Sequence, residues 1–258
     1  MSRNNIDVYN SMTMMKLSKL RLYYMKFRQR YLPKFTPSLY FTKILQMEGI
    51  SVGDHTKFFE PNTLQIDRER PWMLKIGDYC KITAGCTILT HDYSRSVTRM
   101  YCGDIIGEAG QTTIGNNVFI GMYSIILMGA NIGDNVIIGA GSVVSGKIPS
   151  NVVVAGNPAK VVMTLDEHIV RRKNKQLKSA FLYFNNFVDY YHKEPTIKEM
   201  GPFFPLFLER SMEAIQREGV NVHPNGDNSD DLINHFLNSE PVFSSYEEFK
   251  KEAYKNHE

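Results

Sequence analysis

The chain has 258 residues, of which 43% are hydrophobic, and its formal net charge is +3. It is long enough to bury a substantial core, and three cysteines are too few for a disulfide-rich scaffold. No apolar run is long enough to cross a membrane, and the first thirty residues lack the apolar core of a signal peptide. We therefore expect a cytoplasmic protein.

Residues 1–49 form a basic N-terminal segment with two predicted helices. Residues 1–48 hold nine lysines and arginines against two acids. Between residues 14 and 32, bulky apolar side chains recur at spacings of three and four among these cations, which is typical of an amphipathic basic helix. Such a helix can bind an anionic membrane surface or pack on the end of a domain, and both interpretations stay open. A second helix is predicted from the N-cap Thr36 to Gly49.

Residues 50–163 are organised by a period of six. An aliphatic residue returns at every sixth position, namely at Ile114, Ile120, Ile126, Ile132, Ile138 and Val144. Neither an α-helix nor an isolated strand has this period, which is typical of a parallel β-helix with three faces to each coil. Glycines directly follow several of these aliphatic residues, as Gly115 and Gly133 do. They predict tight corners or positive φ angles there.

The same pattern begins earlier and is interrupted once. Its earlier members are Ile76, Ile82 and Ile88. Cys80 and Cys86 occupy the small-residue positions of these coils, so both thiols are predicted to be packing residues. A degraded first coil is expected near Val52. Because the repeat stops after His91, residues 92–112 are predicted to form a loop outside the stack.

Residues 164–258 leave the period and predict a helical C-terminal extension. The sequence from Thr164 to Glu167 has the form of a capping box, and an apolar stripe follows it until Pro195. Further helices are expected near Pro205–Glu218 and Ser245–Lys255. The extension could bind an acceptor, dock a partner or cover the open edge of the β-helix, and the sequence does not choose among these roles.

Three features, in this order along the chain, resemble the hexapeptide-repeat acyltransferases, in particular the maltose/galactoside and polysaccharide O-acetyltransferase branch. They are the six-residue repeat, the loop that opens with HDYS at His91, and the closing phrase IPSNVVVAGNPAKVV. The resemblance covers about residues 50–163. It implies a left-handed parallel β-helix, a homotrimer, and acetyl-CoA bound in clefts between neighbouring helices.

His91 matches the catalytic histidine of this family. An alcohol is a poor nucleophile while it is protonated, and imidazole, with an ordinary pKa of about 6.5, suits the removal of that proton. The resemblance implies direct transfer without an acyl-enzyme, in which His91 deprotonates the acceptor and then protonates the departing thiolate. The group that orients the ring is left open. Asp92 is adjacent but points to the other side of an extended chain, so a carboxylate from another coil or a backbone carbonyl is an equal candidate.

The resemblance also implies that the later coils bind acetyl-CoA. The matching positions are Phe119, Ala140, Gly141, Ser145, Lys147, Asn157, Pro158 and Lys160. Phe119 stands where the galactoside branch has a tryptophan beside the acetyl group, and Lys160 matches a basic residue that meets the phosphates. Lys147 is shifted by one position from the lysine of the family. The alternative is that these residues are ordinary repeat positions of a solenoid that binds no CoA.

Seven residues are candidates for binding a saccharide acceptor: Glu60, Asn62, Asp67, Trp72, Asp92, Tyr93 and Arg95. Planar polar groups suit sugar hydroxyls, and Trp72, the single tryptophan of the chain, could stack on a sugar ring. Each candidate also has an ordinary interpretation as a turn, interface or solvated loop residue.

These observations together favour an acetyl-CoA-dependent O-acetyltransferase that acts on a sugar hydroxyl of a bacterial surface polysaccharide or its precursor. One alternative is acetylation of an amino sugar or antibiotic, and another is a non-catalytic scaffold. A zinc-dependent carbonic anhydrase on the same solenoid would need three histidines, and the repeat region has only His55 and His91. We expect neither a metal nor a nucleic-acid partner.

Overall fold

The structure is a computed structural model that describes residues 20, 23–24, 27, 37–222 and 229–256. Apart from four residues, the predicted basic helix at 14–32 lies outside the described residues, and so does Thr36. The chain divides into two compact units, Met1–Leu165 and Asp166–Glu258, and each is described by itself. Within the described part of the chain, no helix is both long and apolar enough to cross a membrane.

Helix α2 (Ser38–Met47) precedes the β-helix and packs on its first strands. Its buried Phe41 meets Phe58 of the first coil edge to face, with the ring centroids 5.1 Å apart. The N-cap of α2 is Pro37 rather than the predicted Thr36, because the extended backbone of Pro37 (ψ 152°) turns helical only at the next residue. The predicted end at Gly49 is confirmed, since this glycine has φ +99° directly after the C-cap.

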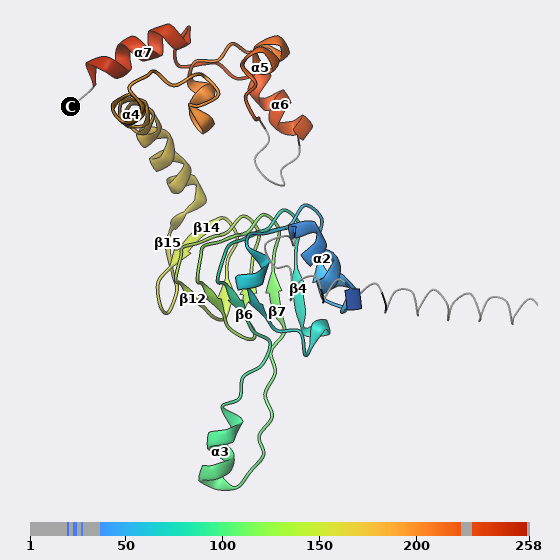
Figure 1. Ribbon diagram of the computed structural model, residues 1–258. Coiled ribbons are helices and arrows are strands. Elements are labelled where there is room, and N and C mark those ends of the chain that lie inside the picture. Colours follow the sequence, from blue (N-terminus) through green and yellow to red (C-terminus); the bar gives the residue numbers. More distant parts are fainter. Residues whose placement is uncertain (1–19, 21–22, 25–26, 28–36, 223–228, 257–258) are drawn as a thin grey trace, which may run out of the picture. The chain divides into compact units, whose positions relative to one another are not determined.

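The β-helix is built from short parallel strands that stack into three sheets (Figure 1). The first sheet contains β1 (Ser51–Val52), β4 (Leu74–Ile76), β7 (Thr112–Ile114), β10 (Asn131–Ile132) and β13 (Lys147–Ile148). The second contains β2 (Lys57–Phe58), β5 (Lys81–Ile82), β8 (Phe119–Ile120), β11 (Ile137–Ile138) and β14 (Val152–Ala155), and β15 (Lys160–Thr164) adds to it antiparallel. The third contains β3 (Gln65–Ile66), β6 (Thr87–Ile88), β9 (Ile125–Ile126) and β12 (Val143–Val144).

The aliphatic residues of the repeat form the core, as the period predicts. Those from Ile114 to Val144 are at most 1% exposed, and equivalent positions pair between coils, as Ile120 does with Ile82 and Ile138. Cys80 and Cys86 are also fully buried. Their burial raises the pKa of both thiols, because a thiolate would lose its solvation there. Their predicted role as packing residues is therefore confirmed.

Two reasons were predicted for the glycines at the corners, a tight corner and a positive φ angle. Only the tight corner is found. Gly115 does not have a positive φ. A Cβ atom on it would lie 2.6 Å from the carbonyl oxygen of Gly133 in the next coil, so close backbone approach requires glycine. The positive φ angles fall instead on the turn residues Asn117 and Asn135 (53° and 55°). Their side chains form a ladder in which Asn117 Nδ2 donates to Asn135 Oδ1 over 2.9 Å.

The break in the repeat is a loop that leaves the stack between β6 and β7 (Figure 1). The sequence did not predict the helix α3 (Arg95–Cys102) within it, since none of the residues of α3 is buried and no apolar stripe marks it against the core. Asp92 starts this segment by accepting hydrogen bonds from the amide (2.9 Å) and hydroxyl (2.8 Å) of Ser94. These bonds lower the pKa of Asp92. Gly103 ends α3 at φ +86°.

The second unit is helical, as predicted. Its elements are α4 (Leu165–Tyr191), η4 (Gly201–Leu206), α5 (Met212–Glu218), α6 (Ser229–Leu237) and α7 (Tyr246–Lys255). The helix predicted at Pro205–Glu218 is wrong in extent, because Ser211 caps a separate helix by accepting the amide of Ala214 over 3.1 Å. Helix α6 was not predicted.

Candidate active site

His91 and Asp67 occupy the same corner in successive coils. Each follows a strand of the third sheet: Asp67 comes directly after β3, and His91 comes after β6. They are 24 residues apart, close to the separation of 22 at which the preceding strands pair, as Ile66 does with Ile88. We call the corner that joins the third sheet of one coil to the first sheet of the next the histidine corner.

Asp67 orients the His91 ring. Asp67 Oδ2 lies 2.5 Å from His91 Nδ1 and also accepts the amide (3.1 Å) and the hydroxyl of Thr90. Asp67 Oδ1 accepts the amide of Glu69 over 3.1 Å. The group that contacts Nδ1 is therefore a carboxylate from another coil, one of the alternatives to Asp92 that the sequence left open.

The carboxyl of Asp67 is held in its ionised form. Its side chain is only 3% exposed. Burial by itself would raise the pKa of Asp67, but the hydrogen bonds from Thr90, Glu69 and His91 stabilise the carboxylate more, and the net pKa lies below its ordinary value. An ionised Asp67 accepts the Nδ1 proton of His91, which leaves the lone pair on Nε2.

Nε2 of His91 is the ring nitrogen available to a substrate. The side chain of His91 is 27% exposed, and Nε2 lies 3.5 Å from an oxygen of the exposed Glu69. The Glu69 carboxylate can therefore form an ion pair with the ring once Nε2 has gained a proton. An imidazole held by a carboxylate at Nδ1, with Nε2 on its partly exposed side, is the arrangement that a general base needs.

Four of the acceptor candidates lie with His91 around the histidine corner. Trp72 is exposed in η3 (Pro71–Met73), just before the first sheet of the second coil. Asp92, Tyr93 and Arg95 follow His91 directly, and the Arg95 guanidinium lies 5.1 Å from the centre of the Tyr93 ring. Asp92 and Arg95 also line a small cavity of about 70 Å³ at the base of the loop.

The other three acceptor candidates are less suited to that role. Glu60 and Asn62 are exposed around η2 (Pro61–Thr63), at the corner between the second and third sheets. Asp67 is at the histidine corner, but its two oxygens are occupied by Thr90, Glu69 and His91. Its position fits a positioning residue for His91 better than a ligand for an acceptor hydroxyl.

The acetyl-CoA candidates are exposed but spread over different parts of the coils within one chain. Ser145 and Lys147 flank the histidine corner of the fourth coil, between β12 and β13. Ala140, Gly141, Asn157 and Pro158 lie at the corner between the second and third sheets, where the amide of Val143 donates to Gly156 over 2.9 Å. Phe119 and Lys160 lie on the second sheet, and Phe119 lines a cavity of about 250 Å³ there.

Thr90, Glu69 and Arg70 are site residues that the sequence reasoning missed. Thr90 and Glu69 hold Asp67, and Arg70 Nη1 donates to the Glu108 carbonyl over 3.2 Å at the base of the loop. The available signal was the coil length. The third sheet pairs residues 22 apart, as Ile66 pairs with Ile88, so the second-coil partner of Asp67 is expected just after β6, within two residues of His91.

Comparison with known proteins identifies relatives of this chain. The family model described as bacterial transferase hexapeptide (six repeats) matches residues 111–146. Protein CapG of Staphylococcus aureus is 40% identical over 124 residues, which cover 46% of this chain and 69% of CapG.

Two O-acetyltransferases match over a shorter stretch. The galactoside O-acetyltransferase of Escherichia coli K12 is 53% identical over 55 residues, which are 21% of this chain and 27% of that protein. The putative lipopolysaccharide biosynthesis O-acetyl transferase WbbJ of the same strain is 46% identical over 55 residues, 21% of this chain and 28% of WbbJ. The chain thus aligns with less than a third of either enzyme.

The six-residue repeat, the three parallel sheets and the match to more than two thirds of CapG agree. The β-helix is left-handed, as the resemblance implied. This chain belongs to the hexapeptide-repeat acetyltransferases, and the protein is an enzyme of that class.

Proposed function

We propose that the protein is an acetyl-CoA-dependent O-acetyltransferase that acetylates a sugar hydroxyl of a bacterial surface polysaccharide or its precursor. The observation that carries this proposal is His91, whose side chain is 27% exposed, whose Nδ1 is held by a buried carboxylate, and whose Nε2 faces the exposed Glu69 at 3.5 Å. The names of two relatives, a galactoside O-acetyltransferase and a lipopolysaccharide biosynthesis O-acetyl transferase, support a sugar hydroxyl as acceptor.

His91 acts as the general base in this proposal. Nε2 removes the proton of the acceptor hydroxyl while the oxygen attacks the thioester carbon of acetyl-CoA. The carbon–sulfur bond then breaks, and the imidazolium returns the proton to the leaving thiolate, so no acyl-enzyme forms. Asp67 stabilises the imidazolium on one side, and Glu69 faces it on the other at 3.5 Å.

The residues present fit acetyl-CoA, with the binding groove between chains of a homotrimer. Lys147 and Lys160 are exposed cations that would meet phosphates, and exposed corners at Gly141 and Ser145 would offer main-chain groups to the pantetheine arm. The candidate residues lie on more than one face of a single chain, which supports a site completed by a neighbouring copy. Exposed apolar side chains on the second sheet and the loop, such as Phe119 and Met100, support such an assembly.

The test is acetyl transfer to a panel of monosaccharides, oligosaccharides, nucleotide sugars and aminoglycosides, read by mass spectrometry. For His91→Ala we expect transfer to fall by at least about 10²–10⁴-fold, the usual contribution of a general base, with acetyl-CoA binding kept. Asp67→Asn should also slow transfer, because an amide can present the wrong hydrogen-bonding group to Nδ1. His55→Ala is the matched control, since the His55 ring stacks on Tyr79, with the ring centroids 4.7 Å apart, rather than on a carboxylate.

Each outcome of this test assigns a function. Acetylation of a sugar oxygen that depends on His91 supports the proposal. Acetylation of an amine would move the protein to the amino sugar or antibiotic class. Full turnover in His91→Ala would remove His91 from its role, and absence of acetyl-CoA binding by the wild type would favour a scaffold.

A further inference from the structure

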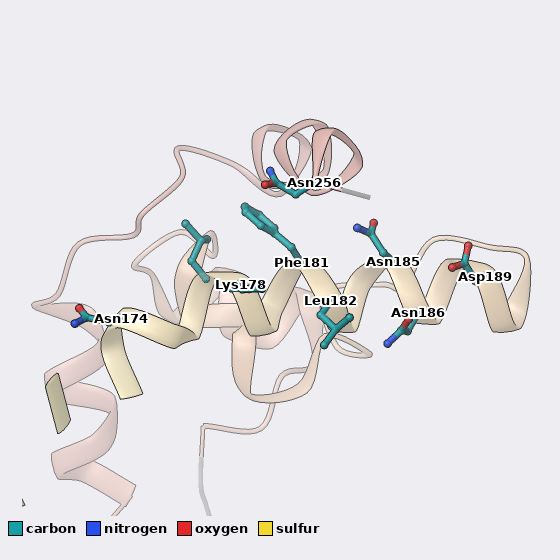
Figure 2. A pocket seen from close by; sticks show the side chains of 9 residues that line it. Asn174, Lys178, Phe181, Leu182, Asn185, Asn186, Asp189 and Asn256 are labelled. Atoms are coloured by element: carbon teal, nitrogen blue, oxygen red, sulfur yellow. The ribbon is translucent and has the colours of Figure 1, made fainter. Parts of the chain in front are cut away.

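The second unit contains a pocket that the catalytic proposal does not use. It has a volume of about 470 Å³, within the range of about 300–1,000 Å³ that is typical of small-molecule sites. It lies along α4, and Figure 2 shows Asn256, from the end of α7, across from Phe181. The lining residues are Asn174, Leu177, Lys178, Phe181, Leu182, Asn185, Asn186, Asp189 and Asn256.

The lining chemistry suits a neutral ligand with many hydroxyl groups. Four carboxamides line the pocket, and each offers both donors and an acceptor, as a hydroxyl group does. Leu177, Phe181 and Leu182 add an apolar surface for the C–H face of a ring. The lining holds one cation, Lys178, and one anion, Asp189, so its formal net charge is zero.

Asn185 carries an unpaired polar atom in the wall of the pocket. The residue is only 6% exposed, and its Nδ2 donates to the Ala253 carbonyl over 3.0 Å. Its Oδ1 is buried and has no hydrogen-bond partner among the described residues. Such an oxygen is costly to leave unpaired in a folded protein. Asn185 also belongs to the lining of the pocket, so this unpaired oxygen lies within its wall.

The same helix extends the pocket with exposed aromatic rings. Tyr190 follows Asn186 by one helical turn on the same row as Leu182, and it is 78% exposed. Its ring centroid lies 4.8 Å from that of the exposed Tyr191. Exposed tyrosines offer flat apolar faces with a polar tip, which suits stacking on successive sugar rings.

We propose that this pocket, with Tyr190 beside it, is a binding site for a neutral saccharide chain, separate from the catalytic coils. In this role the second unit binds one part of the saccharide polymer while another part of the polymer is acetylated. The choice of a saccharide over another neutral ligand rests on the proposed function.

The test uses the full chain and two sets of probes: glucose, galactose and N-acetylglucosamine, and the linear tetrasaccharides of these sugars. Binding is followed by saturation-transfer NMR and titration. We expect wild-type protein to bind at least one neutral probe and to bind glucuronic acid more weakly. Replacing Asn174 and Asn186 together by alanine should weaken binding about tenfold, because hydrogen bonds from two exposed amides are lost. Tyr190→Ala should weaken binding of the tetrasaccharide and leave the monosaccharide unchanged.

The controls separate this inference from the proposed function. Asn234→Ala removes an exposed amide of α6, outside the pocket, and should leave binding unchanged. The pocket variants should keep wild-type acetyl transfer to a monosaccharide. If wild-type protein transfers acetyl groups but binds no neutral probe, or if the double variant binds as wild type does, this inference is wrong. If the sugar binds the pocket while His91→Ala keeps full turnover, the proposed base is wrong and the saccharide site stands.

Discussion

The β-helix and the helical unit bury their cores in opposite ways. In the β-helix each buried residue has equivalents directly above and below it, as Ile126 has Ile88 and Val144. In the helical unit, Phe249 of α7 contacts rings from α4 and from the segments after η4 and α6. A repeated core distributes packing over many similar positions, whereas the aromatic core converges on a few. A mutation should therefore cost more at the centre of the aromatic core.

Phe249→Ala should have the largest effect on stability. Phe249 is fully buried, and its ring lies 4.8–6.0 Å from the rings of five other aromatic residues. We expect a loss of about 3–5 kcal/mol in the unfolding free energy of the helical unit, from lost transfer energy and the cavity left behind. Denaturant unfolding followed by far-UV circular dichroism measures it.

Phe187→Ala is the control for that change, because it removes the same ring from a half-buried position on α4. It should cost clearly less than Phe249→Ala. Equal stability of Phe249→Ala and wild type would contradict a core centred on this residue. Acetyl-CoA binding should persist in both variants, because its candidate residues lie in the other unit.

Gly115→Ala tests the close contact between coils. The new Cβ would lie 2.6 Å from a carbonyl oxygen of the next coil, and backbone cannot move as a flexible side chain does. We expect a loss of about 1–3 kcal/mol, the usual cost of overpacking. Gly107→Ala is the matched control, because nothing lies within 4 Å of its added Cβ. Similar unfolding midpoints for the two variants would show that the coils tolerate separation at this corner.

Ile126→Val should cost less, about 0.5–1.5 kcal/mol, the usual range for this exchange in a core. The equivalent position of the next coil already holds Val144, so the smaller side chain fits the stack. Ile125→Val changes the neighbouring side chain, which is half-buried, and should cost less still. A loss above that of Phe249→Ala would reverse the comparison between the two cores.

The period explains why the β-helix could be predicted in detail. Each coil repeats one local rule, so the burial of Ile120 or Cys86 follows from its place in the period. The pair of Asp67 and His91 was not predicted, because it joins two coils and depends on their alignment. No residue of the helix α3 is buried, so no apolar stripe in the sequence marked it as a helix.

In the helical unit, the sequence predicted local features but not the contacts between distant segments. The beginning of α7 was predicted, because Ser245 caps it locally by accepting the amide of Glu248. The break before α5 was not predicted, because besides the local cap at Ser211 it depends on a longer-range contact. Arg210 donates to the Pro205 carbonyl over 2.6 Å and to Ser239 of a later segment over 3.0 Å. Contacts of this kind have no period and leave no pattern in the sequence.

The smallest effect on stability is expected from a substitution of Glu199, which bonds to Thr196 and Lys193 at the surface of the helical unit. Glu199 accepts the amide (2.8 Å) and hydroxyl (2.9 Å) of Thr196 and pairs with Lys193 at 2.9 Å. The amide of Thr196 is the largest of the contributions that lower the pKa of Glu199 to about 2 from its ordinary 4.5. Because the folded state lowers this pKa, the carboxylate stabilises the unit above pH 4.5, and this contribution is lost as the pH falls towards 2.

Glu199→Gln should therefore lower the melting temperature slightly at neutral pH, and the difference from wild type should shrink below pH 4.5 and vanish near pH 2. Thermal melting across this range measures it, with the exposed Glu240→Gln as the control. A difference that stays constant with pH would mean that Glu199 contributes through packing rather than charge. The acid dependence would then have to come from other carboxylates, since a neutral glutamine cannot titrate and would keep its remaining contacts at every pH.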